Sequence, residues 1–420
     1  MGQMSTSAGN ALRVEADPAE LGLDPGRLER IERHYRRYVD DGRLPGWLVA
    51  IVRHGRLVYL QTAGQRDLEA GLPVEADTLW RIYSMTKPVT SVAAMMLWEE
   101  GAFELRDEVA RFVPSMGDAR VFTGGNALRP VTVPQTEPMR IWHLLTHTAG
   151  LTYGFHHSHP VDRLYREAGF EWGSPPGLDL AGACDAWASM PLLFQPGSEW
   201  NYSVATDVLG RVVEVLSGQS LDAFFAERIL EPLGMHDTSF ALRDEDAARL
   251  AALYSPDPQT GRAARNEVMG QAAFAPPALL SGGGGLLSTA HDYLRFMRML
   301  LGGGELDGVR LLGPRTVAYM GRNHLPGDAD LEHFGRKLFA DSSFDGVGFG
   351  LGFSVVLDPA AGKVPSSAGE MAWGGAASTA FYLDPQEDLG ALFMTQLLPS
   401  STHGAIRPQL RQLVAQALVD

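Results

Sequence analysis

The fold prediction starts from residues 81–98, RIYSMTKPVTSVAAMMLW. In the helical half of this stretch the only charged side chain is that of Lys87, and a helix that is apolar nearly all round is normally buried. Pro88 lacks a backbone N–H, so it fits only in the first turn of that helix. We therefore predict a buried helix with Ser84 at its N-terminus and Lys87 one turn further along the same face.

Ser84 and Lys87 bring a hydroxyl and an amine together at the positive end of this helix. A desolvated lysine can act as a base toward a serine, and the helix N-terminus favours the negative charge that develops on attack. The same four residues also fit a polar helix start with a lysine that reaches toward solvent. Burial favours the catalytic interpretation. So does residue usage, because the chain has only three lysines (Lys87, Lys337 and Lys363) and arginine cannot act as a base.

The composition is that of an acidic globular chain. It has 420 residues, 45% of them hydrophobic, and a net charge of -15, which argues against binding to nucleic acid or to an anionic membrane. Cys184 is the single cysteine, so no internal disulfide can form. Residues 1–20 contain no apolar segment typical of a secretory signal, and no run approaches the length of a membrane helix. We therefore expect a cytoplasmic protein.

Hydrophobic periodicity gives the elements expected around the central helix. Two apolar runs, 48–52 and 57–61, predict a β-hairpin. Residues 124–138 are expected to form a loop, and residues 244–280 an irregular, alanine-rich region. The expected helices lie at 25–41, 105–113, 141–151, 204–216 and 221–230.

The region 281–292 combines four glycines with a helix-start signal. The glycines are not followed by Gly-Lys-Ser/Thr, so a phosphate-binding loop is not predicted. Thr289 and Asp292 form a capping-box pattern, which indicates that a helix begins there. We expect a flexible loop that leads into a helix.

The C-terminal part changes to a strand period. We expect one antiparallel sheet built from both ends of the chain, flanked by the terminal helices, with a helical domain inserted. This α/β (α+β) arrangement divides the chain into an N-terminal extension (1–24), a sheet-containing domain (25–83 with 281–420) and a mostly helical domain (84–280). Ser84 would then lie at the seam, where ligand sites tend to form. The expected C-terminal elements are strands at 348–357, 370–375, 379–383 and 389–396 and a helix at 405–418.

Three histidines, His156, His157 and His159, cluster in a polar and aromatic stretch. Such a cluster can indicate a metal site, but no fourth ligand follows at a recognisable spacing. We predict that this stretch forms a mobile wall of the active site and that the protein uses no metal and no cofactor.

Three short motifs occur in order along the chain: Ser84-Met85-Thr86-Lys87, Tyr202-Ser203-Val204 and Trp373-Gly374-Gly375. Together they resemble the three motifs of the serine β-lactamase and penicillin-binding-protein superfamily, and most closely those of its family VIII carboxylesterases. The resemblance covers roughly residues 25–400 and implies a β-lactamase/transpeptidase-like fold with one catalytic unit over about 25–410. Further stretches that look like this group lie at 147–151, 202–210, 231–235 and 282–296.

The resemblance also implies roles for individual residues. Ser84 would be the acylated nucleophile, with Lys87 and Tyr202 together as the base, because flanking cations can stabilise a phenolate. The backbone N–H groups of Ser84 and Ala376 would form the oxyanion hole. Tyr153 would line the pocket and form a hydrogen bond near Ser84.

The third motif would shape the edge of the pocket. Gly374 and Gly375 would let the substrate approach the strand closely. β-Lactamases of this type carry Lys-Thr-Gly where this chain has Trp373-Gly374-Gly375, and an asparagine where it has Val204. The resemblance therefore implies an apolar pocket edge that suits neutral esters. The polar and aromatic wall at 153–176 gives no sign of a deep pocket, which favours short acyl groups.

We accordingly predict a serine carboxylesterase that cleaves short-acyl esters of small molecules and binds neither nucleic acid nor membrane. One alternative is a β-lactamase or D-alanyl-D-alanine peptidase, although the missing secretory signal argues against a periplasmic peptidase. Another is a non-catalytic penicillin-binding-like module, which the intact Ser84, Lys87 and Tyr202 argue against. The chain has no Gly-x-Ser-x-Gly, so the nucleophile elbow of an α/β-hydrolase is excluded.

Overall fold

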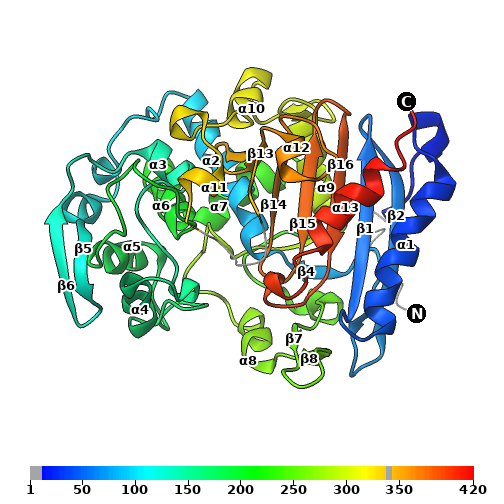
Figure 1. Ribbon diagram of the computed structural model, residues 1–420, viewed down its shortest axis with the longest axis horizontal. Coiled ribbons are helices and arrows are strands. Elements are labelled where there is room, and N and C mark those ends of the chain that lie inside the picture. The colour runs from blue at the N-terminus through cyan, green and yellow to red at the C-terminus, as the bar shows by residue number, and fades with distance from the viewer. Residues whose placement is uncertain (1–11, 337–342) are drawn as a thin grey trace, which may run out of the picture.

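An eight-stranded antiparallel sheet forms the centre of the fold (Figure 1). The computed structural model describes residues 12–336 and 343–420. The strand order is β12-β13-β14-β15-β16-β1-β2-β3, so strands from both ends of the chain share one sheet, as predicted. The strands are β1 (Gly46–Arg53), β2 (Arg56–Asp67), β3 (Leu72–Pro73), β12 (Val347–Phe349), β13 (Ser354–Val356), β14 (Met371–Gly374), β15 (Ala380–Asp384) and β16 (Leu389–Met394).

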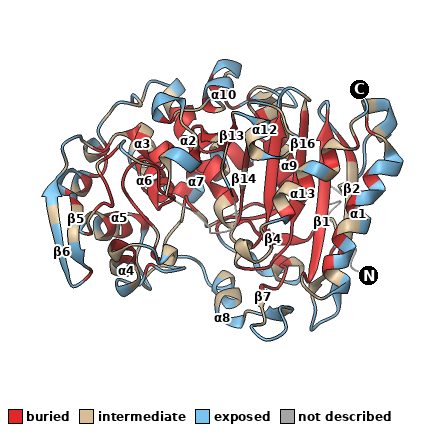
Figure 2. Ribbon diagram, in the orientation of Figure 1, coloured by how far each residue is buried: buried red, intermediate tan, exposed pale blue. Residues whose placement is uncertain are grey.

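Helices cover both faces of this sheet. The terminal helices α1 (Pro25–Asp40) and α13 (Ile406–Ala415) pack together on one face, and α9 (Ala290–Leu301) packs against β1, β15 and β16. Strand β1 is buried along its whole length, so its alternating side chains enter two different hydrophobic clusters (Figure 2). This arrangement confirms the predicted sheet flanked by the terminal helices.

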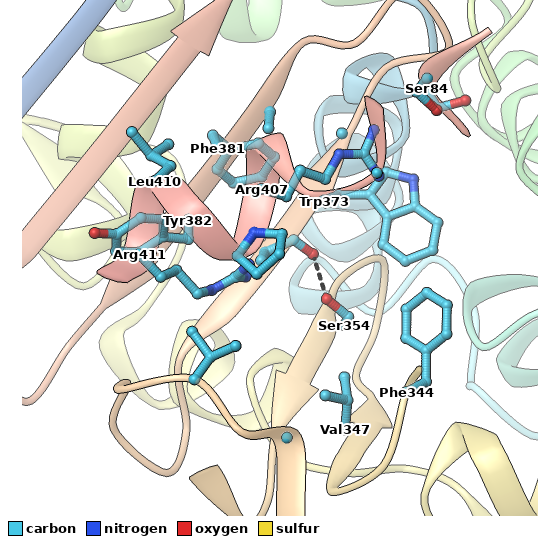
Figure 3. A pocket seen from close by; sticks show the side chains of 18 of the residues that line it. Ser84, Phe344, Val347, Ser354, Trp373, Phe381, Tyr382, Arg407, Leu410 and Arg411 are labelled. Carbon is cyan, nitrogen blue, oxygen red and sulfur yellow. Dashed lines mark hydrogen bonds between the residues drawn. The ribbon is translucent and has the colours of Figure 1, made fainter. Parts of the chain in front are cut away.

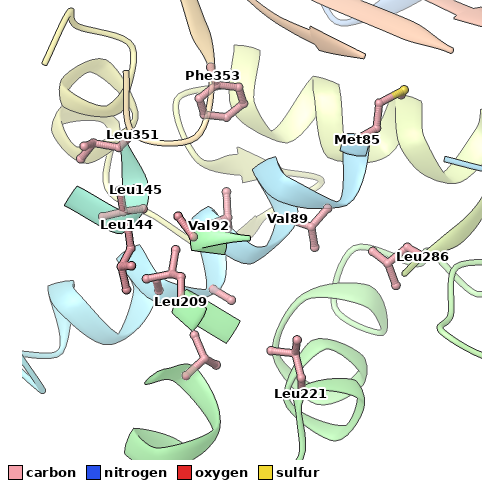
Figure 4. Close-up of a cluster of buried hydrophobic side chains, with 14 of the residues drawn as sticks. Met85, Val89, Val92, Leu144, Leu145, Leu209, Leu221, Leu286, Leu351 and Phe353 are labelled. Carbon is pink, nitrogen blue, oxygen red and sulfur yellow. The ribbon is translucent and has the colours of Figure 1, made fainter. Parts of the chain in front are cut away.

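Helix α2 (Thr86–Glu99) connects the sheet to the helices on its other side (Figure 4). It is buried from Thr86 to Leu97, as the apolar sequence predicts. One hydrophobic cluster runs from the inner side chains of β1 through Val89 and Val92 of α2 to Leu209 of the next large helix. The division into a sheet-containing and a helical domain stays a prediction, because one core runs through both. The helices beyond α2 are α3 (Ile141–Leu145), α4 (Pro160–Glu167), α5 (Leu180–Ala188), α6 (Ala205–Ser217) and α7 (Leu221–Phe225).

Two predicted elements in the first half of the chain are wrong. Residues 105–113 contain only the 3-10 turn Val109–Arg111, not an α-helix. The loop expected at 124–138 is largely a β-hairpin of β5 (Arg120–Asn126) and β6 (Arg129–Pro134). The Asn126 side chain accepts hydrogen bonds from the N–H groups of Leu128 and Arg129, which closes the turn between these strands.

Other boundaries differ for local backbone reasons. The helix expected at 141–151 ends at Leu145, because His147 has a φ of 56° and cannot continue it. The single strand expected at 348–357 is split into β12 and β13 by a turn in which Gly352 has a φ of 99°. The second helix of the 204–230 region continues past α7 as the π-helical turn Ala226–Leu230.

The helix cap predicted at Thr289 is present. Thr289 caps α9 by accepting a hydrogen bond from the N–H of Asp292, as predicted. Of the predicted N-terminal extension, residues 1–11 lie outside the described residues. Within residues 12–336 and 343–420, no helix has the length and hydropathy needed to cross a membrane. The short elements are β4 (Leu79–Arg81), β7 (Tyr254–Pro256), β8 (Ala263–Arg265), β9 (Leu287–Thr289), β10 (Glu305–Leu306), β11 (Val309–Arg310), α8 (Glu267–Gly270), α10 (Pro314–Met320), α11 (Leu331–Phe334) and α12 (Pro359–Gly362).

Candidate active site

Ser84 lies in the 3-10 turn Tyr83–Met85, directly before α2. Tyr83 has a φ of 43°, a left-handed conformation that costs a residue with a side chain roughly 1–3 kcal/mol. Hydrogen bonds hold the turn from two sides: the N–H of Ile82 donates to Leu286 O, and the Tyr293 hydroxyl donates to Met85 O. The surrounding fold therefore fixes the serine in a sharp turn at the start of a buried helix.

The Lys87 amine is almost completely buried, with 2% of the residue exposed. Its Nζ lies 2.7 Å from Gly283 O, 2.9 Å from Tyr153 OH and 3.3 Å from Ser84 Oγ. A carbonyl oxygen can only accept, so one N–H must point at Gly283. A neutral amine would donate its other N–H to Tyr153 and direct its lone pair at the Ser84 hydroxyl, which is the geometry that general-base catalysis requires.

Asp207 of α6 is a buried carboxylate that the sequence analysis did not select. It accepts hydrogen bonds from the Ser281 hydroxyl and from the N–H of Gly283, whose carbonyl in turn contacts Lys87. Burial raises the pKa of Asp207, while the charge of Lys87 and these hydrogen bonds act in the opposite direction. The available signal for this residue was an aspartate flanked by the apolar residues 204–205 and 208–209 at the start of a predicted helix.

Tyr202 presents the face of its ring, rather than its hydroxyl, to the Lys87 amine. The Lys87 Nζ lies over the face of the Tyr202 ring, 4.4 Å from its centre. The Tyr202 hydroxyl accepts a hydrogen bond of 3.3 Å from Trp373 Nε1. Burial raises the pKa of the Tyr153 hydroxyl well above its usual value, as do the charges of Asp207 and Tyr202. The structure thus brings together Ser84, Lys87, Tyr153, Tyr202 and Trp373.

The end of β14 approaches Ser84 closely. A Cβ atom on Gly375 would lie 2.5 Å from Ile82 O, so only glycine permits this approach. The N–H of Gly375 is bonded to Thr379 O, whereas that of Ala376 has no acceptor among the residues the structure describes. Ser84 and Ala376 both line the same cavity, so their backbone amides are in a position to be tested as an oxyanion hole.

A cavity of about 500 Å³ opens at Ser84 and extends along β14 beneath α13 (Figure 3). Pockets of this size bury most of a drug-sized ligand. The expectation that the protein lacks a deep pocket is therefore wrong. Among the described residues, the predicted wall at 153–176 contributes Phe155 and Trp172 alone, and most of the lining comes from residues 343–411, which include parts of β13, β14, β15 and α13.

Two arginines of α13, Arg407 and Arg411, also line this cavity. Arg411 forms an ion pair with the buried carboxylate of Glu370. Burial lowers the pKa of Arg407 to about 10, which leaves the guanidinium positively charged at neutral pH. The edge of the pocket is thus not wholly apolar, contrary to the prediction, because two guanidinium groups from a helix that is distant in the sequence also line the cavity.

Not every selected residue reaches the cavity. Val204 is buried in the main hydrophobic core at the start of α6 and is not among the lining residues. His156 Nε2 lies 2.7 Å from the backbone oxygen of Tyr202, His157 lies 3.0 Å from Glu171, and His159 caps α4. In the part of the chain that the structure describes, no three His, Cys, Asp or Glu side chains gather as metal ligands.

Comparisons with known proteins identify the family of the chain. The Beta-lactamase family model matches residues 31–416. Protein Rv1367c of Mycobacterium tuberculosis is 40% identical, over 89% of this chain and 90% of its own. Esterase EstB of Burkholderia gladioli is 32% identical, over 95% of this chain and 98% of its own.

A solved structure extends the likeness to three dimensions. EstCE1, described as a hydrolase with promiscuous acyltransferase activity, superposes with a TM-score of 0.78 at 30% identity, covering 93% of this chain and 98% of its own. The fold is thus β-lactamase/transpeptidase-like, and the chain is an enzyme of the serine hydrolase type. It belongs to the beta-lactamase family, within the serine β-lactamase and penicillin-binding-protein superfamily, and its place there is with the family VIII carboxylesterases.

Proposed function

We propose that this protein is a serine carboxylesterase that hydrolyses small-molecule esters through an acyl-enzyme on Ser84. The observation that carries the proposal is the position of the buried Lys87 amine, which contacts Tyr153 OH and Ser84 Oγ, and Ser84 in turn lines a mostly apolar cavity. The likeness to an esterase and to a hydrolase supports the same reaction class.

In the first half of the reaction, Ser84 Oγ attacks the ester carbonyl carbon as its proton passes to the base formed by Lys87 and Tyr202. The amides of Ser84 and Ala376 stabilise the resulting oxyanion. When the intermediate collapses, the carbon–oxygen bond to the alcohol breaks, and the leaving alkoxide takes up the proton. Water then attacks the acyl-enzyme in the same way and releases the acid.

The shape of the cavity sets the range of esters. Its lining is mostly apolar and its volume is about 500 Å³, so it accepts an apolar group larger than the short acyl chain expected from the sequence. Trp373 occupies the motif position where β-lactamases of this type carry lysine, which favours esters over β-lactams.

Acyl transfer is a second activity that one observation favours, namely the likeness to EstCE1. An alcohol in place of water would attack the acyl carbon, and Ser84 Oγ would leave with the alcohol's proton. Adding a primary alcohol to the assay should yield its ester beside the free acid. Formation of the acid alone at every alcohol concentration would contradict this second activity.

Replacement of the nucleophile tests the main proposal. Ser84→Ala should abolish hydrolysis of nitrophenyl butyrate and labelling by a fluorophosphonate, because the attacking oxygen is gone. Ser91→Ala is the matched control: Ser91 lies in the same helix, is buried, and has no hydrogen-bond partner among the described residues. Equal labelling of both variants would contradict the assignment of Ser84.

A further inference from the structure

Part of the cavity lies over a patch of small residues on neighbouring strands, which we call the small-residue floor. Ser354 of β13 is paired with Ala372 of β14, and Gly374 of β14 is paired with Ala380 of β15. Residues that are directly paired, or two apart on one strand, point to the same face of a sheet. All four residues line the cavity. Little side-chain volume therefore covers the sheet at this place.

The same face of the sheet is filled a little further along. Ala380 is paired on its other side with Phe393 of β16, and the centre of the Phe393 ring lies 4.8 Å from that of Tyr35 in α1. Both aromatic residues belong to the hydrophobic cluster between the sheet and the terminal helices. Under α1 the sheet is thus packed with large side chains, whereas the small-residue floor leaves space under α13.

Two arginines hold α13 above the floor at the two ends of β14. Arg407 Nη2 lies 3.1 Å from Gly375 O and 3.4 Å from Thr379 O, just beyond the last residue of β14. Arg411, one helical turn further along, donates from Nε to the carboxylate of Glu370, which directly precedes β14. In Figure 3 Arg407 lies nearer the nucleophile and Arg411 lies further from it. Two long side chains fixed in this way prevent the helix from closing onto the small residues between them.

The space between the floor and the helix is mostly apolar. The Ser354 hydroxyl donates a hydrogen bond of 2.8 Å to Ala372 O, so its donor is already used. Leu410 of α13 lines the space from above, and Val356 and Val364 line its side. An empty apolar cavity lowers the stability of a protein, and an apolar ligand that fills it recovers part of that loss.

We propose that the space between the small-residue floor and α13 binds an apolar chain of the ester, and that Ala372 and Ala380 make room for this chain. Ser84 lines the same cavity, so a chain bound there can be continuous with the ester bond at the nucleophile. This inference rests on the proposed function, because Ser84 performs the cleavage. It assigns a binding subsite and two residues that determine substrate preference.

A purely structural reason for the two alanines would have a different consequence. If they were small only because the sheet needs small residues there, a larger side chain would slow the hydrolysis of all esters equally. A binding role makes the loss selective for the ester with the longer chain, and the loss should fall mainly on KM.

The experiment compares three esters on the wild-type enzyme and on three variants. Ethyl hexanoate and hexyl acetate are isomers that carry a hexanoyl chain on the acyl side or a hexyl chain on the alcohol side, and ethyl acetate carries neither. Ala372→Leu and Ala380→Leu fill the space from two neighbouring strands. Ala360→Leu is the matched control, because Ala360 is exposed on α12 and does not line the cavity.

The wild-type enzyme should favour at least one of the two isomers over ethyl acetate by about tenfold or more in kcat/KM, because each buried CH₂ group strengthens binding roughly fourfold. Ala372→Leu and Ala380→Leu should remove most of that preference, and Ala360→Leu should keep it. The isomer that is affected identifies the side of the ester that occupies the space.

Two results would overturn the proposal. One is the absence of any preference for either isomer in the wild-type enzyme. The other is a preference that survives in both Ala372→Leu and Ala380→Leu, or equal losses on all three esters in variants that melt at the wild-type temperature.

A binding measurement separates this proposal from the proposed function. The Ser84→Ala variant lacks the nucleophile, so Trp fluorescence or calorimetry can report its affinity for the same three esters. Tighter binding of one isomer than of ethyl acetate, lost when Ala372→Leu is added, supports the subsite even if no ester is hydrolysed. Equal affinity for all three esters would reject the subsite even if hydrolysis through Ser84 is established.

Discussion

The two ends of the cavity handle charge in different ways. At the Ser84 end, the Lys87 amine has three partners, and the carboxylate of Asp207 lies behind the Gly283 loop that positions it. At the α13 end, Arg411 is neutralised by Glu370, but Arg407 contacts only backbone carbonyls among the described residues. The first end is a closed network that fixes geometry for chemistry, whereas at the second end one guanidinium has no carboxylate partner among the described residues.

The largest effect should come from the amine in the closed network. Lys87→Arg keeps a positive charge but cannot accept a proton, so it should lose as much activity as Lys87→Ala, ~10²–10⁴-fold in kcat/KM. Steady-state hydrolysis of nitrophenyl butyrate measures this loss. Near-wild-type activity of Lys87→Arg would mean that Lys87 serves as a structural cation and not as a base.

A buried histidine of α3, which does not line the cavity, should limit stability in acid. Burial and nearby Arg140 lower the pKa of His143 to about 3, so the folded protein keeps this ring neutral at pH 5. The unfolded chain takes up the proton below about pH 6.5, so the stability that His143 confers is lost as pH falls from 6.5 toward 3. From pH 7.5 to 5, His143 alone should account for about 2 kcal/mol of lost unfolding free energy.

His147 adds to this acid sensitivity, because burial, helped by Lys87 and His156, lowers its pKa well below the usual value. Urea unfolding at the two pH values tests the pair. His143→Gln should show a smaller loss between pH 7.5 and 5 than wild type. An unchanged loss would mean that His143 is protonated in the folded protein.

Two buried carboxylates, one at each end, sharpen the comparison further. Asp207→Asn keeps an acceptor for Ser281 and Gly283 but removes the charge near Lys87, and should lower kcat about tenfold. Glu370→Gln removes the charge that balances Arg411, and should lower the melting temperature with little change in kcat. Similar kcat values for the two variants would remove the distinction between the ends.

The smallest effect concerns acyl length. The cavity of about 500 Å³ should let octanoate esters react at least as well as acetate esters, with palmitate slower than both. The measurement is kcat/KM along a series of nitrophenyl esters. A steady fall from acetate to octanoate would restore the short pocket expected from the sequence.

Features that depend on residues close together in the sequence could be predicted. Ser84, Lys87 and Pro88 lie within one helical turn, so their arrangement follows from the periodicity of a single helix. The hairpin, the terminal helices and the strands of the sheet were likewise predicted from local patterns. The β5–β6 hairpin was missed because its glycines and prolines masked the alternation at Val131 and Val133.

The rest of the site depends on contacts between distant residues. Gly283 reaches Lys87 across 196 positions and Arg407 reaches Gly375 across 32, and no local pattern indicates either approach. Val204 was selected through its motif, yet its helix turns it into the core. The cavity arises from strands and a helix that meet only in the folded chain, so its depth was not predicted.

The central claim is that Ser84 carries the acyl group, and trapping the intermediate tests it directly. The enzyme is mixed with excess nitrophenyl acetate, quenched in acid within milliseconds to seconds, digested and examined by mass spectrometry. The account predicts one added acetyl group on the peptide that contains Ser84, at a level that follows the burst of nitrophenol and is absent from Ser84→Ala. A burst of nitrophenol with no acetyl group on Ser84, or with the label on another residue, would contradict it.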